Sequence, residues 1–441
     1  MFIIKMNKTS KIFTQFLKDN FGVQKNTPIF SAKSAAFLKT IYKDIIKAEQ
    51  TWIVTGKESI HGHQPHLGHI HGNQFNEHNH NQNQNHDPDY SYIPQEIRYM
   101  IEHDDHWVNQ YQFSLHGRTY TISMIHPMSV QDTETKIRRF FEDVLHKIYL
   151  WLSVASQFAS NHCSQQMHIH LFFTNHIKTI ASASMVPLDQ IHSNSAFTTG
   201  CANSTKIHIF RKEEWFKVFI HETFHNLGLD FSNMDNRFAN RSILQLFHIS
   251  TKEIRLYETY CEMWAELIHL LLFVFFTTND RVLGNFARIL QKMERLLHYE
   301  ILFSRFQCAK ILNHYQITYQ QLTDPASKRI LESRYKENTY ILAYYIIKSV
   351  LLSEPDQFIK WCLDHNGRTL EFRKTQDNVQ DFGQLVKLSY KTPIFLDKMQ
   401  KMEEWFSDNT NGSLRDPLRT TLRSTLRDPL RSTLRMSLFE L

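Results

Sequence analysis

The chain has 441 residues, of which 42% are hydrophobic, enough to form a substantial core in one large or two medium domains. That composition excludes an intrinsically disordered protein. The net charge is +6, but six arginines against two aspartates in residues 413–435 supply +4 of it. The rest of the chain is nearly neutral, so the charge gives no support for nucleic-acid binding.

The cysteines and the N-terminus indicate a cellular compartment. The five cysteines are odd in number and show no paired spacing: Cys163, Cys201, Cys261, Cys308 and Cys362. This pattern predicts reduced thiols in an intracellular protein. Residues 1–8 hold only a few consecutive apolar side chains, so they do not form a signal peptide. The apolar run 267–276 is too short to span a bilayer and is predicted to be a buried helix, leaving no membrane span.

Residues 1–56 form a predicted N-terminal helical segment, with helices at 12–20 and 32–50. Residues 57–90 form a predicted disordered insertion, because the stretch 61–86 is rich in His, Asn and Gln and almost lacks large apolar side chains. Its eight histidines leave weak metal binding as the alternative role.

Residues 91–410 form the predicted main domain, which carries strands in its first half, to about 235, and helices after that. The first half is expected to contain a long amphipathic helix at 134–158 and a loop at 193–205. Its predicted strands are 98–102, 111–115, 119–125, 167–174 and 206–210. Strands followed by helices indicate an α+β domain.

The second half is predicted to be almost entirely helical. Ser250 and Glu253 have the spacing of a capping box, which would open a helix that continues to about residue 276. Further helical patterns cover 280–298, 301–314, 337–353, 355–364 and 393–406.

The tail, residues 411–441, contains a twelve-residue duplication, 414–425 followed by 426–437. Pro417 and Pro429 exclude a continuous helix, and two repeats are too few for a solenoid. The tail is therefore predicted to be mostly disordered. An Arg-rich contact with acidic partners is the alternative.

The segment 215–230 contains His221-Glu222-Thr-Phe-His225, an HExxH motif within a helical pattern that ends at Gly228. Two histidines one helical turn apart project from the same face, so both imidazoles can reach one zinc ion. Glu222, beside the first histidine, is then placed to act as a general base. The strand 206–210 precedes this helix, as the motif requires.

A hydrolytic zinc site uses three protein ligands. The extended motif HExxHxxGxxH would put a third histidine at position 231, but that residue is Phe231. An acid on a second helix is the other common solution, and Glu258, Glu262 and Glu266 follow one another at four-residue spacing on one helix face. A solvated acidic stripe is the alternative interpretation, but the same helix runs on into the apolar segment 267–276.

The order of HExxH followed by a helix with Glu-x-x-Ala-acid resembles the gluzincin metallopeptidases. The blocks 221–231 and 258–265 also resemble uncharacterised zinc-peptidase-like proteins of large DNA viruses. The resemblance covers about residues 205–266. It implies one zinc ion bound by His221, His225 and Glu262, with Glu258 as the runner-up for the third ligand.

The resemblance also implies that Glu222 is the catalytic base and that Glu266 orients a metal-binding histidine, a task that Asp230 could equally perform. The hydroxyl that stabilises the oxyanion is left open among Tyr257, Tyr260, Tyr344 and Tyr345, each of which could instead be a packing aromatic.

The sequence thus predicts a zincin-like α+β fold, with a small mixed sheet, an active-site helix and a mostly helical C-terminal subdomain. The predicted function is zinc-dependent hydrolysis of peptide bonds in a peptide or protein substrate. A catalytically inactive zinc-binding structural or host-interaction protein is the alternative. The strand 206–210 is expected to be a sheet edge that pairs with substrate. If the source is viral, the protein is expected in the host cytoplasm or the virion.

Overall fold

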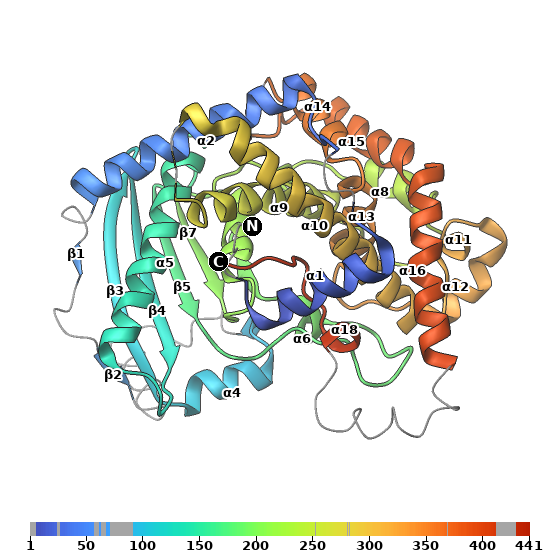
Figure 1. Cartoon of the computed structure of the whole chain (residues 1–441), viewed down its shortest axis with the longest axis horizontal. Coiled ribbons are helices and arrows are strands. Elements are labelled where there is room, and N and C mark those ends of the chain that lie inside the picture. The colour runs from blue at the N-terminus through green and yellow to red at the C-terminus, as the bar shows by residue number, and fades with distance from the viewer. Residues whose placement is uncertain are drawn as a thin grey trace.

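The computed structural model describes residues 6–23, 27–56, 61–62, 68–70, 91–251, 253–279, 281, 283–367, 369–411 and 429–441. Its architecture is mixed α+β, with a sheet on one side and a large helical mass on the other (Figure 1). The sequence prediction of an α+β protein is confirmed at this level. The predicted insertion 57–90 lies almost entirely outside the described residues.

The strands form one mixed sheet in the order β1-β3-β4-β5-β7-β6, and β2 also pairs with β3. Strands β3 and β4 form the predicted antiparallel hairpin, whereas β4, β5 and β7 run parallel. The strand bounds are β1 His61–Gly62, β2 Gly68–Ile70, β3 His106–Leu115, β4 Arg118–Pro127, β5 Gln166–Phe172, β6 Ala196–Thr198 and β7 Ser204–Ile209. Because β7 lies between β5 and β6, the prediction that this strand is a sheet edge is wrong. The edge on this side is β6, antiparallel to β7.

Alternating apolar side chains give the sheet two buried faces. Tyr120, Ile122 and Met124 on β4 face the main core, which α5 (Glu134–Ala155) and α7 (Trp215–Asn226) help to enclose. On the other face, α4 (Gln95–His103) packs Ile97 and Ile101 into a smaller core. Residues 98–102, predicted to be a strand, therefore belong to a helix. The two isoleucines are one helical turn apart, but only Ile101 lies within residues 98–102, so this helical spacing does not show in that window.

The helical half surrounds α9 (Leu256–Phe276) and the long α10 (Phe286–His314). By length and composition α9 could cross a membrane, but 94% of its most apolar window is buried inside the protein. The other helices of more than one turn are α1 Lys8–Phe21, α2 Ala32–Thr51, η1 Trp52–Gly56, α8 Arg237–Leu244, α12 Lys328–Arg334, η5 Leu342–Ile347, α13 Lys348–Leu352, α14 Pro355–His365, α15 Gln376–Ser389 and α16 Pro393–Asn411. Single turns form α6 Gln190–Ser193, η3 Leu283–Asn285, α11 Tyr319–Leu322, η4 Pro325–Ser327 and α18 Pro429–Ser432.

Two predicted helix boundaries are wrong. The capping box at Ser250 does not form: α9 begins only at Leu256, and Glu253 pairs with Arg255 at 3.0 Å. The predicted break near residue 300 is absent from α10. Glu300 is 1% exposed, and its buried carboxylate binds backbone N–H groups of the chain end.

The tail prediction is wrong for residues 429–441, whereas 412–428 lie outside the described residues. From α18 the chain runs into the middle of the molecule (Figure 1), where Ser10 Oγ of α1 donates a hydrogen bond to Leu438 O at 2.5 Å. Leu434 and Phe439 are both 0% exposed. The composition of the repeat suggested disorder, but these side chains complete the core.

The cysteine prediction is wrong for one pair, since Cys163 and Cys201 form a disulfide across 38 residues. The other three cysteines are free and buried. The disulfide joins two loops that meet at Gly228. A Cβ atom on Gly228 would lie 2.9 Å from the Cys163 Sγ, and its φ of +66° also favours glycine.

The buried chain end makes a direct prediction. Phe439→Ala removes a fully buried ring and should lower the free energy of unfolding by about 3–5 kcal/mol. Urea denaturation would measure the loss. Leu388→Ala is the control, because Leu388 is 77% exposed and its truncation should cost no more than about 0.5 kcal/mol. A stability unchanged by Phe439→Ala would contradict the buried position.

Candidate metal centre

Helix α7 is enclosed on every side, and all twelve of its residues are buried. Its apolar stripe of Phe216, Ile220 and Phe224 belongs to the main core. On the side toward α5, Trp151 Nε1 donates a hydrogen bond to Thr223 Oγ1 at 2.7 Å. The helix is therefore held in a fixed rotation, which decides where its polar side chains point.

The end of α7 positions one histidine. The left-handed backbone at Gly228 turns the chain back, and Asp230 Oδ2 comes within 2.5 Å of His225 Nδ1. A carboxylate on Nδ1 fixes the ring orientation and leaves Nε2 to face the site. Asp230 thus lies where the sequence interpretation proposed, beside a histidine of the motif.

Three side-chain atoms converge between α7 and α9. His221 Nε2 lies 3.2 Å from His225 Nε2 and 3.0 Å from Glu258 Oε2, and His225 Nε2 lies 3.4 Å from the same oxygen. Zinc bonds of 2.0–2.1 Å in a tetrahedral site require ligand atoms about 3.3 Å apart. The three measured edges match that spacing, so these residues fit a zinc ion.

The geometry favours Glu258, the runner-up, over Glu262 as the third ligand. Glu262 lies on the other side of His221, with Oε1 3.0 Å from Nδ1. The two helices are antiparallel: His225, near the end of α7, meets Glu258 at the start of α9, and His221 meets Glu262 one turn on. Only Glu258 reaches both Nε2 atoms.

Glu266 does not contact a histidine in the described structure. Its Oε2 lies 2.7 Å from Lys348 Nζ, one turn further along α9 than the site. The orienting task that the sequence interpretation gave to Glu266 falls geometrically to Glu262, which lies against His221. Both predicted roles on α9 thus move one helical turn toward its start: the third ligand from Glu262 to Glu258, and the orienting residue from Glu266 to Glu262.

Two buried lysines complete the site and were missed from the sequence. Lys217 Nζ lies 2.5 Å from Glu262 Oε2, and Lys348 Nζ lies 3.4 Å from the same oxygen. Burial would raise the pKa of Glu262, but these two cations hold it well below its usual range. Lys217 stands four residues before His221 on α7, a spacing that could have indicated it. Lys348 is distant in sequence and gave no signal.

Glu222 differs from the other acids because it has no partner. Its carboxylate makes no hydrogen bond or ion pair with the described residues, and 9% of the residue is exposed. Burial raises its pKa, and the carboxylates of Glu258 and Glu262 add to the rise against the opposing effect of the two histidines. Glu222 is thus a buried carboxylate that is free to exchange a proton.

Of the four candidate tyrosines, two are occupied elsewhere. Tyr260 donates its hydroxyl to Leu370 O, and Tyr345 donates to Leu434 O. The ring of Tyr344 lies 6.3 Å from the His221 ring, and that of Tyr257 lies 6.0 Å from the His225 ring. Burial together with the nearby Glu258 and Glu222 carboxylates raises the pKa of Tyr344, so its hydroxyl stays protonated and able to donate.

No protein-family model, curated protein or solved structure matches this chain. The residues of the site therefore carry the functional argument alone.

The two histidines should make the metal-free protein less stable at high pH. Burial would lower the pKa of His221, but the Glu258 and Glu262 carboxylates raise it to about 9. The unfolded value is about 6.5, so the stabilisation is complete below pH 6.5 and is lost as the pH rises through 9. For His221 alone the loss is about 3 kcal/mol, and His225, whose pKa is also raised, adds to it.

Urea unfolding in the presence of a chelator, at pH 6.5 and pH 9, would measure this loss. Glu258→Gln is the matched variant, because it removes one charged partner of both imidazoles and should make the pH dependence shallower. A metal-free protein that becomes more stable between pH 6.5 and 9 would contradict the charged pairs.

Proposed function

We propose that the protein is a zinc-dependent peptidase with a zincin-like active site, in which His221, His225 and Glu258 hold the metal and Glu222 is the general base. The observation that carries the proposal is the triangle of two imidazole nitrogens and one carboxylate oxygen, with edges of 3.0, 3.2 and 3.4 Å. Three protein ligands on one side of an ion are the arrangement of catalytic zinc sites, which keep a position open for water.

Zinc is the metal that this donor set fits best. Two neutral imidazoles and one carboxylate are typical ligands of catalytic zinc. The acids of the cluster also outnumber its lysines, so a divalent cation offsets an excess of buried negative charge. Asp230 accepts the Nδ1 proton of His225, and Glu262 Oε1 lies 3.0 Å from Nδ1 of His221, so both carboxylates favour a proton on Nδ1 and leave each Nε2 for the metal.

Zinc bound here would supply a Lewis acid that acidifies a water molecule and polarises the substrate carbonyl. Glu222 takes the proton of the attacking water, because its carboxylate lies beside the site and has no competing partner. The same side chain then delivers the proton to the leaving amine.

Tyr344 is the candidate for stabilising the oxyanion on the side of His221. Its ring lies beside His221, and its hydroxyl makes no hydrogen bond to the described residues. A neutral O–H in a buried site stabilises developing negative charge without further reorganisation. Tyr257 is the other candidate, on the side of His225.

Zinc affinity should distinguish the three glutamates of α9. Glu258→Gln removes a ligand and should weaken zinc binding at least tenfold more than Glu262→Gln. Glu262→Gln removes the partner of His221 and should cost about 10–100-fold. Glu266→Gln is the control on the same helix face and should have the smallest effect, because Glu266 contacts Lys348 and neither histidine. Competition titration against a zinc-binding dye would measure all three. A larger loss in Glu262→Gln than in Glu258→Gln would reverse the assignment.

The base is tested by Glu222→Gln. This variant should retain one zinc per chain and lose about 10²–10⁴-fold in cleavage rate, because the amide cannot accept the proton of the water. Zinc content by elemental analysis and cleavage of a fluorogenic peptide library would be compared for both proteins. Undiminished cleavage by Glu222→Gln would reject the base. Zinc binding by the wild type without cleavage of any peptide would favour the inactive zinc-binding protein.

A further inference from the structure

The end of the chain, residues 433–440, is bound inside the protein as a peptide is bound by a receptor. Apart from Glu440, each of its residues is buried; Leu434, Ser437 and Phe439 are 0% exposed. The segment is neither helix nor part of the sheet, apart from one isolated bridge between Thr433 and Thr179. Its backbone groups must therefore find other partners within the protein.

Two buried carboxylates accept the backbone N–H groups of this segment. Glu214 accepts from Met436 at 2.9 Å and from Ser437 at 2.6 Å. Glu300 accepts from Leu438 and Phe439 at 2.8–3.0 Å. Burial would raise the pKa of Glu214, but Lys178 and Lys217 hold it well below its usual range, so Met436 and Ser437 donate to a charged group, among the stronger polar contacts in proteins. Burial and the neighbouring Glu266 raise the pKa of Glu300 well above its usual range, so Leu438 and Phe439 donate to a carboxyl that favours its neutral form.

The carbonyl groups of the segment are bound by donors from four separate parts of the chain. Lys310 and Gln307 on α10 donate to Thr433 O, and Gln307 also donates to Arg435 O at 2.6 Å. The remaining donors are Tyr345 to Leu434 O, Lys348 to Met436 O and Ser10 to Leu438 O. Side chains of the rest of the protein, here called the body, thus donate hydrogen bonds to the backbone of the segment along its length, as in a peptide-binding channel.

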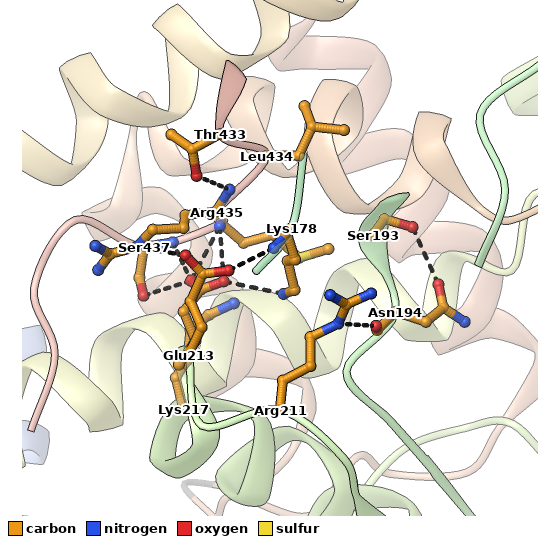
Figure 2. A network of polar contacts seen from close by, with 12 residues as sticks. Lys178, Ser193, Asn194, Arg211, Glu213, Lys217, Thr433, Leu434, Arg435 and Ser437 are labelled. Atoms are coloured by element: carbon orange, nitrogen blue, oxygen red, sulfur yellow. Dashed lines mark hydrogen bonds and ion pairs between the residues drawn. The ribbon is translucent and has the colours of Figure 1, made fainter. Parts of the chain in front are cut away.

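Side chains of the segment are recognised as well (Figure 2). The body places Glu213 beside Arg435, with Oε1 3.9 Å from Nε, and Glu440 of the segment itself lies 3.1 Å from Nη2. Ser437 Oγ donates to Glu214 Oε1 at 2.7 Å. The ring of Phe439 lies 5.4 Å from that of Phe273 on α9. The body therefore contacts an arginine, a small hydroxyl residue and an aromatic residue at fixed positions of the segment.

The channel adjoins the helix that carries the candidate metal site. Glu214 directly precedes α7 and has a φ of +59°, a left-handed conformation that costs energy for a non-glycine residue. Without the segment, the Glu214 carboxylate would keep Lys178, at 2.9 Å, but lose its contacts with Met436 and Ser437. A buried charge that loses its partners destabilises the structure around it.

A second connection runs through Lys348. Its Nζ binds Met436 O at 2.8 Å and Glu266 Oε2 at 2.7 Å, and it lies 3.4 Å from Glu262 Oε2. Glu262 in turn lies against Nδ1 of His221. The chain end thus contacts a residue that holds the carboxylate beside a metal-binding histidine.

We propose that the body of the protein contains a peptide-binding channel, that its ligand is the segment 433–440 of the same chain, and that occupancy of the channel holds α7 and Glu262 in the metal-binding arrangement. The first two parts stand independently of the metal, and the third rests on the proposed zinc site.

The sequence provides a natural control peptide. Residues 421–426 span the junction of the two repeats; they read Thr-Leu-Arg-Ser-Thr-Leu and match Thr-Leu-Arg-Met-Ser-Leu at 433–438. The residue that follows is Arg427 after the first of these stretches and Phe439 after the second. An arginine in the place of Phe439 would face Phe273 in a buried site, where an unpaired charge is costly. The channel should therefore reject a peptide that carries residues 421–427 in place of 433–439.

To test this, a recognition sequence for a site-specific protease is placed within residues 412–428 of the full chain, and the folded protein is cut there. The fragment 429–441 should co-elute with the body on gel filtration. A labelled synthetic 429–441 peptide should replace it, and a 417–429 peptide should compete at least tenfold less well. Glu214→Gln should weaken retention at least tenfold. Immediate loss of the fragment, or equal competition by the two peptides, would overturn the proposal of a peptide-binding channel.

Zinc affinity of the cut protein tests the coupling. Removal of the fragment should weaken zinc binding about tenfold, the effect expected when a group that orients a ligand is disturbed, and added 429–441 peptide should restore it. An affinity independent of the fragment would overturn the coupling. If the uncut protein binds no zinc, the proposed function is wrong, and so is the proposed link between the segment and the metal site. The peptide-exchange experiment still tests whether the channel exists.

Discussion

The structure depends on one constraint: a helix that is buried on all sides carries four ionisable side chains on its polar face. Lys217, His221, Glu222 and His225 of α7 are each no more than 9% exposed. Buried ionisable groups are tolerated only when charge and hydrogen bonds are matched nearby. Helix α9 provides the match, because its acids recur at the same four-residue spacing and the two helices run antiparallel. The paired side chains of α7 and α9 form a ladder. The candidate metal site lies at one end of this ladder, and the lysines that pair with Glu262 and Glu266 lie at the other.

The surrounding elements hold α7 in a fixed position and rotation relative to α9. The bond from Trp151 fixes the rotation of α7, and the Gly228 turn returns Asp230 to His225. The disulfide packs against Gly228 so closely that no side chain fits there. At the opposite end of α7, the chain terminus binds Glu214. Both ends of α7 are thus held by segments that are distant in sequence.

Features that depend on residue spacing within one helix could be predicted from the sequence. Features that depend on how two helices align, or on burial by distant segments, could not. The four-residue spacing of His221 with His225, and of Glu258 with Glu262, was readable because each lies on one helix. Which glutamate faces which histidine depends on how the helices slide past each other, and a shift of one turn, about 5.4 Å, exchanges Glu258 and Glu262. Periodicity within one segment carries no information on that shift.

The prediction of a disordered tail was wrong for a related reason. Its repeat, prolines and arginines are typical of disorder, yet Arg435 is neutralised by acids and Leu434 fills the core. Partners such as Glu213 and Glu300 lie more than a hundred residues away, so composition within the tail could not reveal them. Polar residues that interrupted a pattern, among them Lys217 and Glu300, were the ones that bind buried charges or buried backbone.

Crystals of the zinc-loaded protein, measured on both sides of the zinc absorption edge, test the central claim most directly. The account predicts one anomalous peak, about 2.0–2.1 Å from His221 Nε2, His225 Nε2 and a carboxylate oxygen of Glu258. Glu262 should remain against Nδ1 of His221 and outside bonding distance of the ion. A peak bonded to Glu262 in place of Glu258, or no peak between the two histidines, would contradict the account.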